Sequence, residues 1–529
     1  MKILPTVIRG LACVCFVCAA EMAFACDRIP AGETLWVRLT APITTYSAKP
    51  GDPVHAVLTE DLVCDDEVVL PMGAPVEGVV RSRRKVGLGF VHETASLEIE
   101  FTQATAQPGI SLDLVARVEE VENAREKVRN GVILGIRSTA TVQGTANSRL
   151  KHLPTWNPYS DLILITYDTT FPIFPEPEIY YPAGTDIRLQ TTKEIPLPPA
   201  MAAAGQLYPS PRQPESSRPE SNLPESDQPE SNQPEEDSLR QLVAQMPTRA
   251  TNTRHVEADL INMVFLGSET QVKSAFRLAG WNGADSHGPG AWAKNFYALL
   301  NNSGYPKQPM MKFLLDGKPE DMKWQRNLNS YGHRDHLRLW QWTGKGAPGP
   351  VASEPIAAEP VWAGSCTHDD SAAFNFRHFR FMHHVAPHID DERSTVLRAL
   401  TFAGCVKSVS YVPRPVPITS LRSTMGEVML TDGAVAVVTL QDCRPVLPQA
   451  DLSAKRVRFK PGNYVFRYIR RQVLGYRNLI FRENFIYGAY ALTRVTVKAL
   501  RPKPPIVENV KATPPRTKTH TQTAVAATR

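Results

Sequence analysis

The chain has 529 residues, a length that allows two or three domains with separate hydrophobic cores. Its formal net charge of +6 is small for that length and by itself implies no particular partner. After the N-terminus no segment has the apolar length of a membrane span, which excludes a protein with several such spans.

The N-terminus has the pattern of a secretory signal peptide over residues 1–25. Lys2 and Arg9 precede an apolar run over residues 10–20, and Ala-Phe-Ala at 23–25 supplies a cleavage pattern. Cys26 follows directly, so a lipoprotein anchored through Cys26 is the alternative, although Ala23 stands where a lipobox prefers leucine. We therefore expect an exported, membrane-associated protein of the periplasm or cell envelope.

Five cysteines remain after cleavage, and an exported protein can oxidise them. Two disulfides are predicted, Cys26–Cys64 in the N-terminal domain and Cys366–Cys405 in the next domain, with Cys443 left over. The alternative is that these cysteines are buried thiols. The mature chain has no C-x-x-C pattern, which argues against a cysteine zinc knuckle or a thioredoxin-like site.

Residues 28–192 are predicted to form an all-β domain, a small barrel or sandwich. Apolar and polar residues alternate over 34–40, 53–59, 75–81 and 96–101, with turn residues between them. The phrases I-P-A-G-E (29–33), K-P-G-D-P-V (49–54) and L-P-M-G-A-P-V-E-G (70–78) resemble the β-barrel of TrbI-like type IV secretion channel proteins. That resemblance implies attachment or binding of a protein partner and carries no catalytic residues.

Two segments have the composition of disordered chain. Residues 193–250 are rich in proline and contain the repeats P-E-S-N-L, P-E-S-D-Q and P-E-S-N-Q, which offer few apolar groups to bury. The tail over 502–529 is rich in Pro, Thr, Ala and Lys. We expect a linker and a tail that flank a second folded region.

Residues 251–415 are predicted to form an α+β domain. Strands are expected over 261–266, 311–315, 336–340 and 360–364. Ser268 is the expected N-cap of a helix that ends at Gly280, and a second helix is expected over 391–403, capped by Asp390 or Asp391.

Several separated motifs in this domain resemble the LssY C-terminal domain family. They are G-S-E-x-x-V…A-G-W, H-L-R-L-W, V-W-A-G and H-I-D-D-E-R, in that order, within residues 255–410. In related bacterial proteins this domain accompanies membrane segments and a lipid-phosphatase-like domain. The resemblance thus implies work on phosphorylated or lipid substrates at the envelope.

Histidine, arginine and acidic residues gather in two segments, 331–340 and 381–393. Alternation along a strand puts His336 and Arg338 on one face. One interpretation is a site for zinc, manganese or iron, whose expected ligands are His336, Asp369, His384, His388 and Asp390. An H-E-x-x-H zinc helix is excluded, because Pro387 interrupts the pair and no Glu follows His384.

Two other interpretations of these residues remain open. In a metal-free site, His336, His384 and Asp390 act as catalytic acid/base groups, while Arg338 and Arg393 bind the anionic substrate. Alternatively the charged groups form structural ion pairs and helix-end contacts. The first two interpretations predict a hydrolase of a phosphoester or ester; the third predicts a non-catalytic envelope binding or scaffold protein.

Residues 416–501 are predicted to form a basic, β-rich extension. Basic residues outnumber acids over 455–498 and are interleaved with aromatic residues. In an exported protein we expect anionic lipid or another envelope polymer as the partner, and no nucleic acid. The alternative is a solvated basic face.

Overall fold

The computed structural model describes residues 27–64, 67–89, 92–107, 110–141, 174–197, 233–343, 360–375, 380–423, 426–446 and 461–481, with five further residues between 492 and 500. The predicted signal peptide, most of the predicted linker and the predicted tail lie outside these ranges. The described residues up to Tyr476 belong to one compact unit, and those from Arg477 onward belong to a second.

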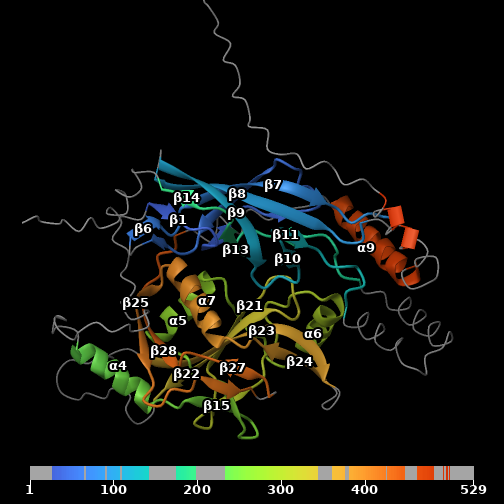
Figure 1. The fold of residues 1–529 in the computed structure, drawn as a ribbon. Helices are drawn as coiled ribbons and strands as arrows, with labels where there is room; N and C mark the ends of the chain where they lie inside the picture. The colour runs from blue at the N-terminus through green and yellow to red at the C-terminus, as the bar shows by residue number, and fades with distance from the viewer. Residues whose placement is uncertain are drawn as a thin grey trace, which may run out of the picture. The chain divides into compact units, whose positions relative to one another are not determined.

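The N-terminal region is a closed antiparallel β-barrel, which confirms the predicted all-β domain (Figure 1). Six strands follow one another round the ring, and β9 closes it by pairing with both β13 and β8. In ring order they are β8 (Ser96–Gln107), β7 (Pro75–Arg84), β4 (Pro53–Leu58), β2 (Thr34–Leu39), β13 (Asp186–Thr191) and β9 (Ile110–Val121). Four of these strands cover the segments predicted from alternation.

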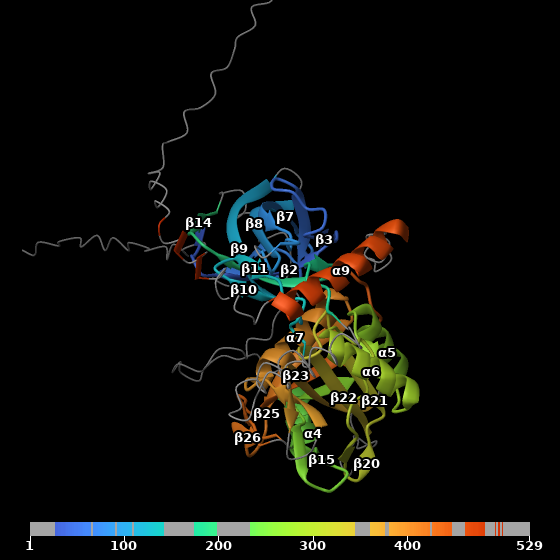
Figure 2. The ribbon, with the colours of Figure 1, turned by 90° about the vertical axis from the view of Figure 1, so that its right-hand side faces the viewer.

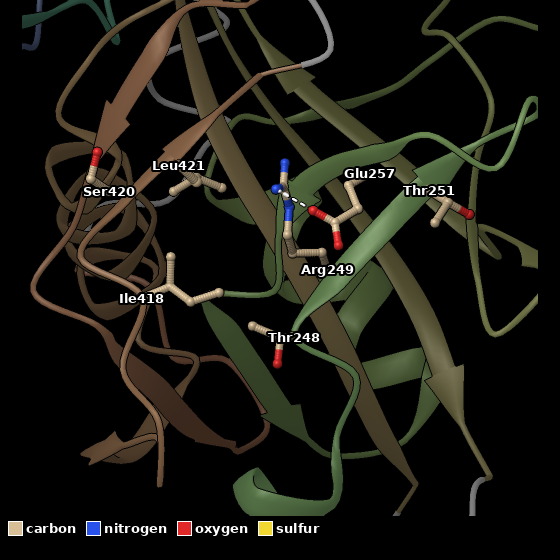
Figure 3. Close-up of a pocket in the computed structure, with 7 residues that line it drawn as sticks. All are labelled: Thr248, Arg249, Thr251, Glu257, Ile418, Ser420 and Leu421. Atoms are coloured by element: carbon tan, nitrogen blue, oxygen red, sulfur yellow. Dashed lines mark hydrogen bonds and ion pairs between the residues drawn. The ribbon is translucent and has the colours of Figure 1, made fainter.

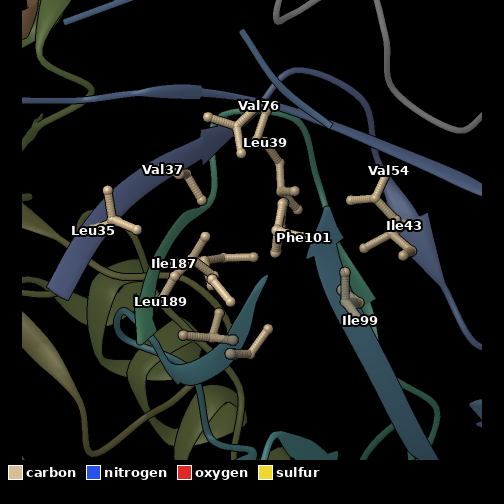
Figure 4. Packing of buried hydrophobic residues seen from close by; sticks show 14 of the residues in the cluster. Leu35, Val37, Leu39, Ile43, Val54, Val76, Ile99, Phe101, Ile187 and Leu189 are labelled. Atoms are coloured by element: carbon tan, nitrogen blue, oxygen red, sulfur yellow. The ribbon is translucent and has the colours of Figure 1, made fainter. Parts of the chain in front are cut away.

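Alternate side chains of the ring strands fill the barrel, as Figure 4 shows. Val37 and Leu39 from β2, Phe101 from β8, and Ile187 and Leu189 from β13 are each at most 1% exposed. Because side chains in a strand alternate between faces, one apolar set fills the barrel while the polar set faces outward.

Short strand pairs surround the ring. They are β1 (Arg28–Ile29) with β14 (Ile195–Pro196), β3 (Ile43–Thr44) with β12 (Tyr180–Tyr181), β5 (Leu62–Cys64) with β6 (Glu67–Leu70), and β10 (Lys127–Arg129) with β11 (Val132–Leu134), which extends the sheet beside β8. β14 lies within the predicted linker, so the folded region continues past residue 192.

The C-terminal region is built on an eight-stranded mixed sheet, which confirms the predicted α+β class. Its strands are, in order, β18 (Asn282–Gly283), β21 (Met322–Arg326), β22 (Arg334–Trp342), β23 (Val361–Asn375), β17 (Met263–Leu266), β28 (Ala434–Leu440) and β25 (Val406–Pro413), with β24 (Arg380–Val385) paired to β23. β28 lies beyond the predicted domain end at 415, yet it pairs with β17 inside the sheet.

Both faces of this sheet are covered. On one face Phe276 of α5 (Glu269–Leu278) and Leu400 of α7 (Ile389–Phe402) pack against Leu337 and Leu339 of β22. The other face packs on α4 (Gln233–Gln245) and on a second sheet made of β16 (Glu257–Leu260), β15 (Arg249–Asn252), β19 (Phe313–Leu315) and β20 (Lys318–Pro319). The polar residues of β22 from Arg334 to Arg338 are therefore buried whichever way they point.

Three further elements complete the described fold: α6 (Pro289–Asn301), the hairpin β26 (Ser420–Arg422) with β27 (Val428–Leu430), and α9 (Pro461–Phe481). Figure 2 shows α9 as a long helix. Within the described residues, no helix has the length and apolar character needed to cross a bilayer.

The predicted cap of α5 is confirmed. Ser268 Oγ accepts the Gln271 N–H at 3.2 Å, and Gln271 Oε1 accepts the Ser268 N–H at 2.8 Å. These reciprocal bonds form a capping box and satisfy two backbone donors at the helix start.

Three local predictions differ from the structure. α7 begins at Ile389 with His388 as N-cap, because Asp390 instead accepts bonds from the 431–432 turn. α4 lies inside the predicted disordered linker, where Leu239, Leu242 and Val243 supply one apolar helix face. α9 lies inside the extension predicted as β-rich; its aromatic residues favoured a strand by propensity alone.

The predicted Cys366–Cys405 disulfide is wrong. Cys405 is bonded to Cys443, because β25 and β28 pair and bring Val406 opposite Leu440. Cys366 is a buried free thiol next to Asn262 Oδ1, which confirms the buried-thiol alternative for this residue. Cys26 lies outside the described residues, so the Cys26–Cys64 pairing stays a prediction.

The variant C405A/C443A is expected to lose roughly 2–4 kcal/mol of unfolding free energy relative to the parent, because the disulfide closes a loop between residues 38 positions apart. Urea denaturation under oxidising conditions measures the loss. Under reducing conditions the parent and the variant should have the same unfolding free energy. Cys366→Ala, as the control, should keep the sensitivity to reductant, and equal oxidised stabilities of parent and double variant would contradict the prediction.

Candidate functional site

Arg338 of β22 is engaged inside the protein. Its Nη1 donates to Asp259 Oδ2 at 2.7 Å, and its guanidinium lies over the ring of Phe313, 4.1 Å from the centroid. Arg338 is 4% exposed and Asp259 is 5% exposed. The predicted anion-binding arginine is therefore a partner in a buried ion pair.

His336 lies on the same face of β22 and is also buried. Thr367 Oγ1 is 2.7 Å from its Nε2, and its Nδ1 is 3.7 Å from Asp369 Oδ2. Burial lowers the pKa of His336 to about 3, so the ring is neutral at pH 7. The structure thus brings together two of the five predicted metal ligands, His336 and Asp369.

Asp369 has two neighbours that the sequence analysis did not single out. Arg334 Nε donates to its Oδ2 at 2.7 Å, and His383 Nδ1 lies 3.5 Å from the same oxygen. Burial, followed by the charge of Arg334, lowers the pKa of His383 to about 4. Because neighbouring side chains in a strand point to opposite faces, His383 faces Asp369 and the predicted His384 does not.

The other predicted residues lie in different contacts. His384 pairs with Glu427, and His388 is exposed at the start of α7. Asp390 accepts bonds from Thr431 Oγ1 (2.9 Å) and the Asp432 N–H (2.6 Å). The five predicted metal ligands do not form one group within the described residues, so that set is corrected.

Arg393, the second predicted substrate-binding residue, is likewise paired. Its Nη1 donates to Asp432 Oδ1 at 3.0 Å and to the Ala434 carbonyl at 2.7 Å. The guanidinium also lies over the Tyr411 ring, 5.1 Å from the centroid. These contacts tie α7 to the turn that precedes β28.

A different group of potential metal ligands lies on the opposite face of β22. Asp335, His368 and Glu392 each offer one ligand atom, and these atoms lie within 4.8 Å of one another. His368 Nδ1 donates to Asp335 Oδ1 at 2.8 Å, and Asn123 Nδ2 donates to Asp335 Oδ2 at 2.7 Å. Although burial opposes its charge, the bond to Asp335 raises the pKa of His368 to about 9.

Sequence reasoning missed this group for two reasons. Asp335 shares its strand face with Leu337 and Leu339, opposite the face of His336 and Arg338 on which the sequence prediction was based. An acidic residue in the first turn of a helix is readily explained by the helix dipole, and sequence alone does not reveal that Glu392 is only 2% exposed. The register that sets His368 opposite Asp335 joins strands more than 30 residues apart, and no local pattern reveals it.

A buried charge network continues from this group towards the barrel strands. Arg38 donates to both oxygens of Asp186, at 2.6 and 2.8 Å. Arg326 pairs with Asp186 and with Glu122, at 2.8 Å from the Glu122 carboxylate. Arg398 pairs with the other Glu122 oxygen at 2.8 Å. No part of this network was predicted, because its members come from five separate segments.

Figure 3 shows a surface pocket between β15, β16 and β26. Arg249 is the cation in its wall, and it donates to Glu257 Oε2 at 2.7 Å and through Nε to the Ala258 carbonyl at 2.9 Å. None of the predicted site residues lines this pocket.

The protein therefore consists of a closed six-stranded β-barrel followed by an α+β domain that contains buried charged residues. Residues 243–435 match the family described as LssY C-terminus, which confirms the resemblance found within this segment. Among solved structures, ComB10 of the Com type IV secretion system of Helicobacter pylori matches with 13% identity and a TM-score of 0.20, over 33% of this chain and 94% of that chain. No curated protein was found to match the chain in sequence.

Proposed function

We propose that this protein is an exported, non-catalytic protein of the cell envelope that binds an anionic membrane surface through α9. Support for export comes from the signal-peptide pattern of residues 1–25. The observation that carries the binding proposal is the exposed apolar face of α9.

This face combines the features of an interfacial helix. Val465, Ile469 and Val473 are 60%, 54% and 49% exposed and recur every four residues, so they form one stripe. Phe466 beside them is 63% exposed. The helix sequence contains four arginines and no acidic residue. Because Arg467 and Arg470 pair with barrel carboxylates, Arg471 and the absence of acidic residues on the helix favour anionic phospholipid beside the apolar stripe.

Two arginines hold α9 so that the stripe faces outward. Arg470 pairs with the buried Glu178 at 2.8 Å, and Arg467 lies 3.5 Å from Glu176. Leu474, on the opposite side of the helix, is fully buried in the barrel's core cluster. The apolar stripe is thus presented on a braced helix, which lowers the ordering entropy that binding would otherwise cost.

The hydrolase predicted from the sequence has less support. Its metal-free form uses Arg338 and Arg393 as an anion clamp, and both guanidinium groups are engaged with carboxylates of this chain. Freeing Arg338 would leave the buried carboxylate of Asp259 uncompensated, a loss of several kcal/mol. We therefore favour the binding or scaffold alternative.

Sedimentation with vesicles tests the proposal. The mature chain from Cys26 onward should pellet with phosphatidylglycerol-containing vesicles, more weakly with phosphatidylcholine alone, and less at high salt. The variant V465S/I469S/V473S should lose roughly tenfold or more in binding, because it removes three inserting side chains. Leu88→Ser, which changes a 60% exposed leucine elsewhere, is the matched control. Equal pelleting of parent and triple variant, or no pelleting of the parent, would overturn the proposal.

A further inference from the structure

We propose that Asp335, His368 and Glu392 form a binding site for a divalent transition metal ion, of the class of zinc, manganese or iron(II), in the interior of the C-terminal domain. One imidazole and two carboxylates make the mixed nitrogen and oxygen donor set that suits these ions. This site is separate from the ligand set predicted from the sequence and does not depend on the membrane-binding proposal.

Three rigid elements position the ligands. Asp335 on β22 and His368 on β23 are direct cross-strand partners, so their side chains lie next to each other on one face of the sheet. Glu392 lies in the first turn of α7, which packs on β23. Each ligand therefore comes from a different element, and all three ligand atoms lie within 4.8 Å of one another.

An unsatisfied oxygen points to a missing ligand. Glu392 is 2% exposed, and among the described residues its Oε1 has no hydrogen-bond partner. A buried carboxylate oxygen without a partner is costly, and a cation between the three side chains would satisfy it.

Asn123 supplies outer support for the site. Its Nδ2 donates to Asp335 Oδ2 at 2.7 Å and fixes the carboxylate, while Asp335 Oδ1 accepts the His368 Nδ1 proton that a bound metal ion would replace. Hydrogen bonds of this kind to a ligating carboxylate orient it and raise metal affinity.

The burial of the site indicates a structural ion. Asp335 and Glu392 are 1% and 2% exposed, whereas a catalytic metal keeps a position open to substrate. A bound ion would link the start of β22, β23 and the first turn of α7, so it should stabilise the folded state by binding to that state alone.

Metal content and thermal unfolding of the mature chain test this inference. The chain, purified with a histidine-free tag and stripped with a chelator, is incubated separately with zinc, manganese and iron(II), desalted and analysed by mass spectrometry. We expect roughly one equivalent of at least one metal and a rise of several degrees in its unfolding midpoint.

Two variants make the test specific. E392Q should keep less than about a tenth of an equivalent, while its metal-free unfolding midpoint should stay near that of the parent, because Gln resembles the neutral carboxyl group. H384Q should retain the full equivalent; loss of metal in H384Q would instead support the ligand set predicted from the sequence. A parent that stays metal-free with all three ions, or E392Q with full occupancy, would overturn the inference. If E392Q does not fold, H368Q takes its place.

Discussion

Asp186→Asn is expected to lower the unfolding free energy of the compact unit by roughly 3–5 kcal/mol, the range found when one partner of a buried ion pair is removed. Asp186 is 2% exposed, and its two oxygens accept bonds from Arg38 and Arg326. Asparagine has one acceptor oxygen, and its amide N–H groups would face the arginine donors. Urea denaturation at pH 7 measures the loss.

Glu120→Gln is the matched control. Glu120 lies on β9, the strand next to β13, and pairs at 2.9 Å with Arg188, but its side chain is 50% exposed. We expect a loss below about 1 kcal/mol, because solvent screens an exposed pair. If Asp186→Asn costs no more than Glu120→Gln, the buried network does not stabilise the fold.

The effect of Asp186 should depend on pH. Burial opposes its charge, but Arg38 and Arg326 outweigh burial and lower its pKa below the ordinary 3.8. The unfolded state therefore takes up a proton first as the pH falls, and the stability from the ion pairs is present above about pH 4 and lost below it. The difference in unfolding free energy between the parent and Asp186→Asn should therefore become smaller as the pH falls below about 4.

The barrel strands could be predicted because their information is local. In β2, for example, Leu35, Val37 and Leu39 alternate with residues of the outer face, and this period of two is visible in six residues of sequence. The closure of the ring could not be predicted. It depends on β13 pairing with both β2 and β9, whose residues are far away in the chain.

In the candidate site, too, local sequence patterns could be predicted and long-range contacts could not. The sequence indicated the two segments that carry the charged residues, since their composition is local. The contacts between these residues depend on which face of the strand each side chain occupies and on the strand register. His383 rather than His384 faces Asp369, and His368 lies opposite Asp335. A shift of one residue would exchange these sets, so only the assembled sheet decides between them.

His383→Gln is expected to reduce the pH dependence of the unfolding free energy between pH 6.5 and 4, to which His336, with a pKa of about 3, also contributes. Burial, followed by the charge of Arg334, lowers the pKa of His383 from its ordinary 6.5 to about 4. Between these values the unfolded state binds a proton that the folded state does not, so stability falls as the pH falls. The titration of one such group lowers the unfolding free energy by up to about 1.4 kcal/mol per pH unit, which amounts to a loss of roughly 3 kcal/mol between pH 6.5 and pH 4.

The readout is the slope of unfolding free energy against pH, which separates this titration from any packing lost at pH 7. His384→Gln removes the adjacent histidine, whose side chain is 43% exposed and pairs with Glu427. It should leave the slope due to His383 in place, because the buried ring beside Asp369 is kept. If His383→Gln and the parent lose stability equally between pH 6.5 and 4, the folded state accepts a proton at His383, and the neutral buried ring is the wrong description.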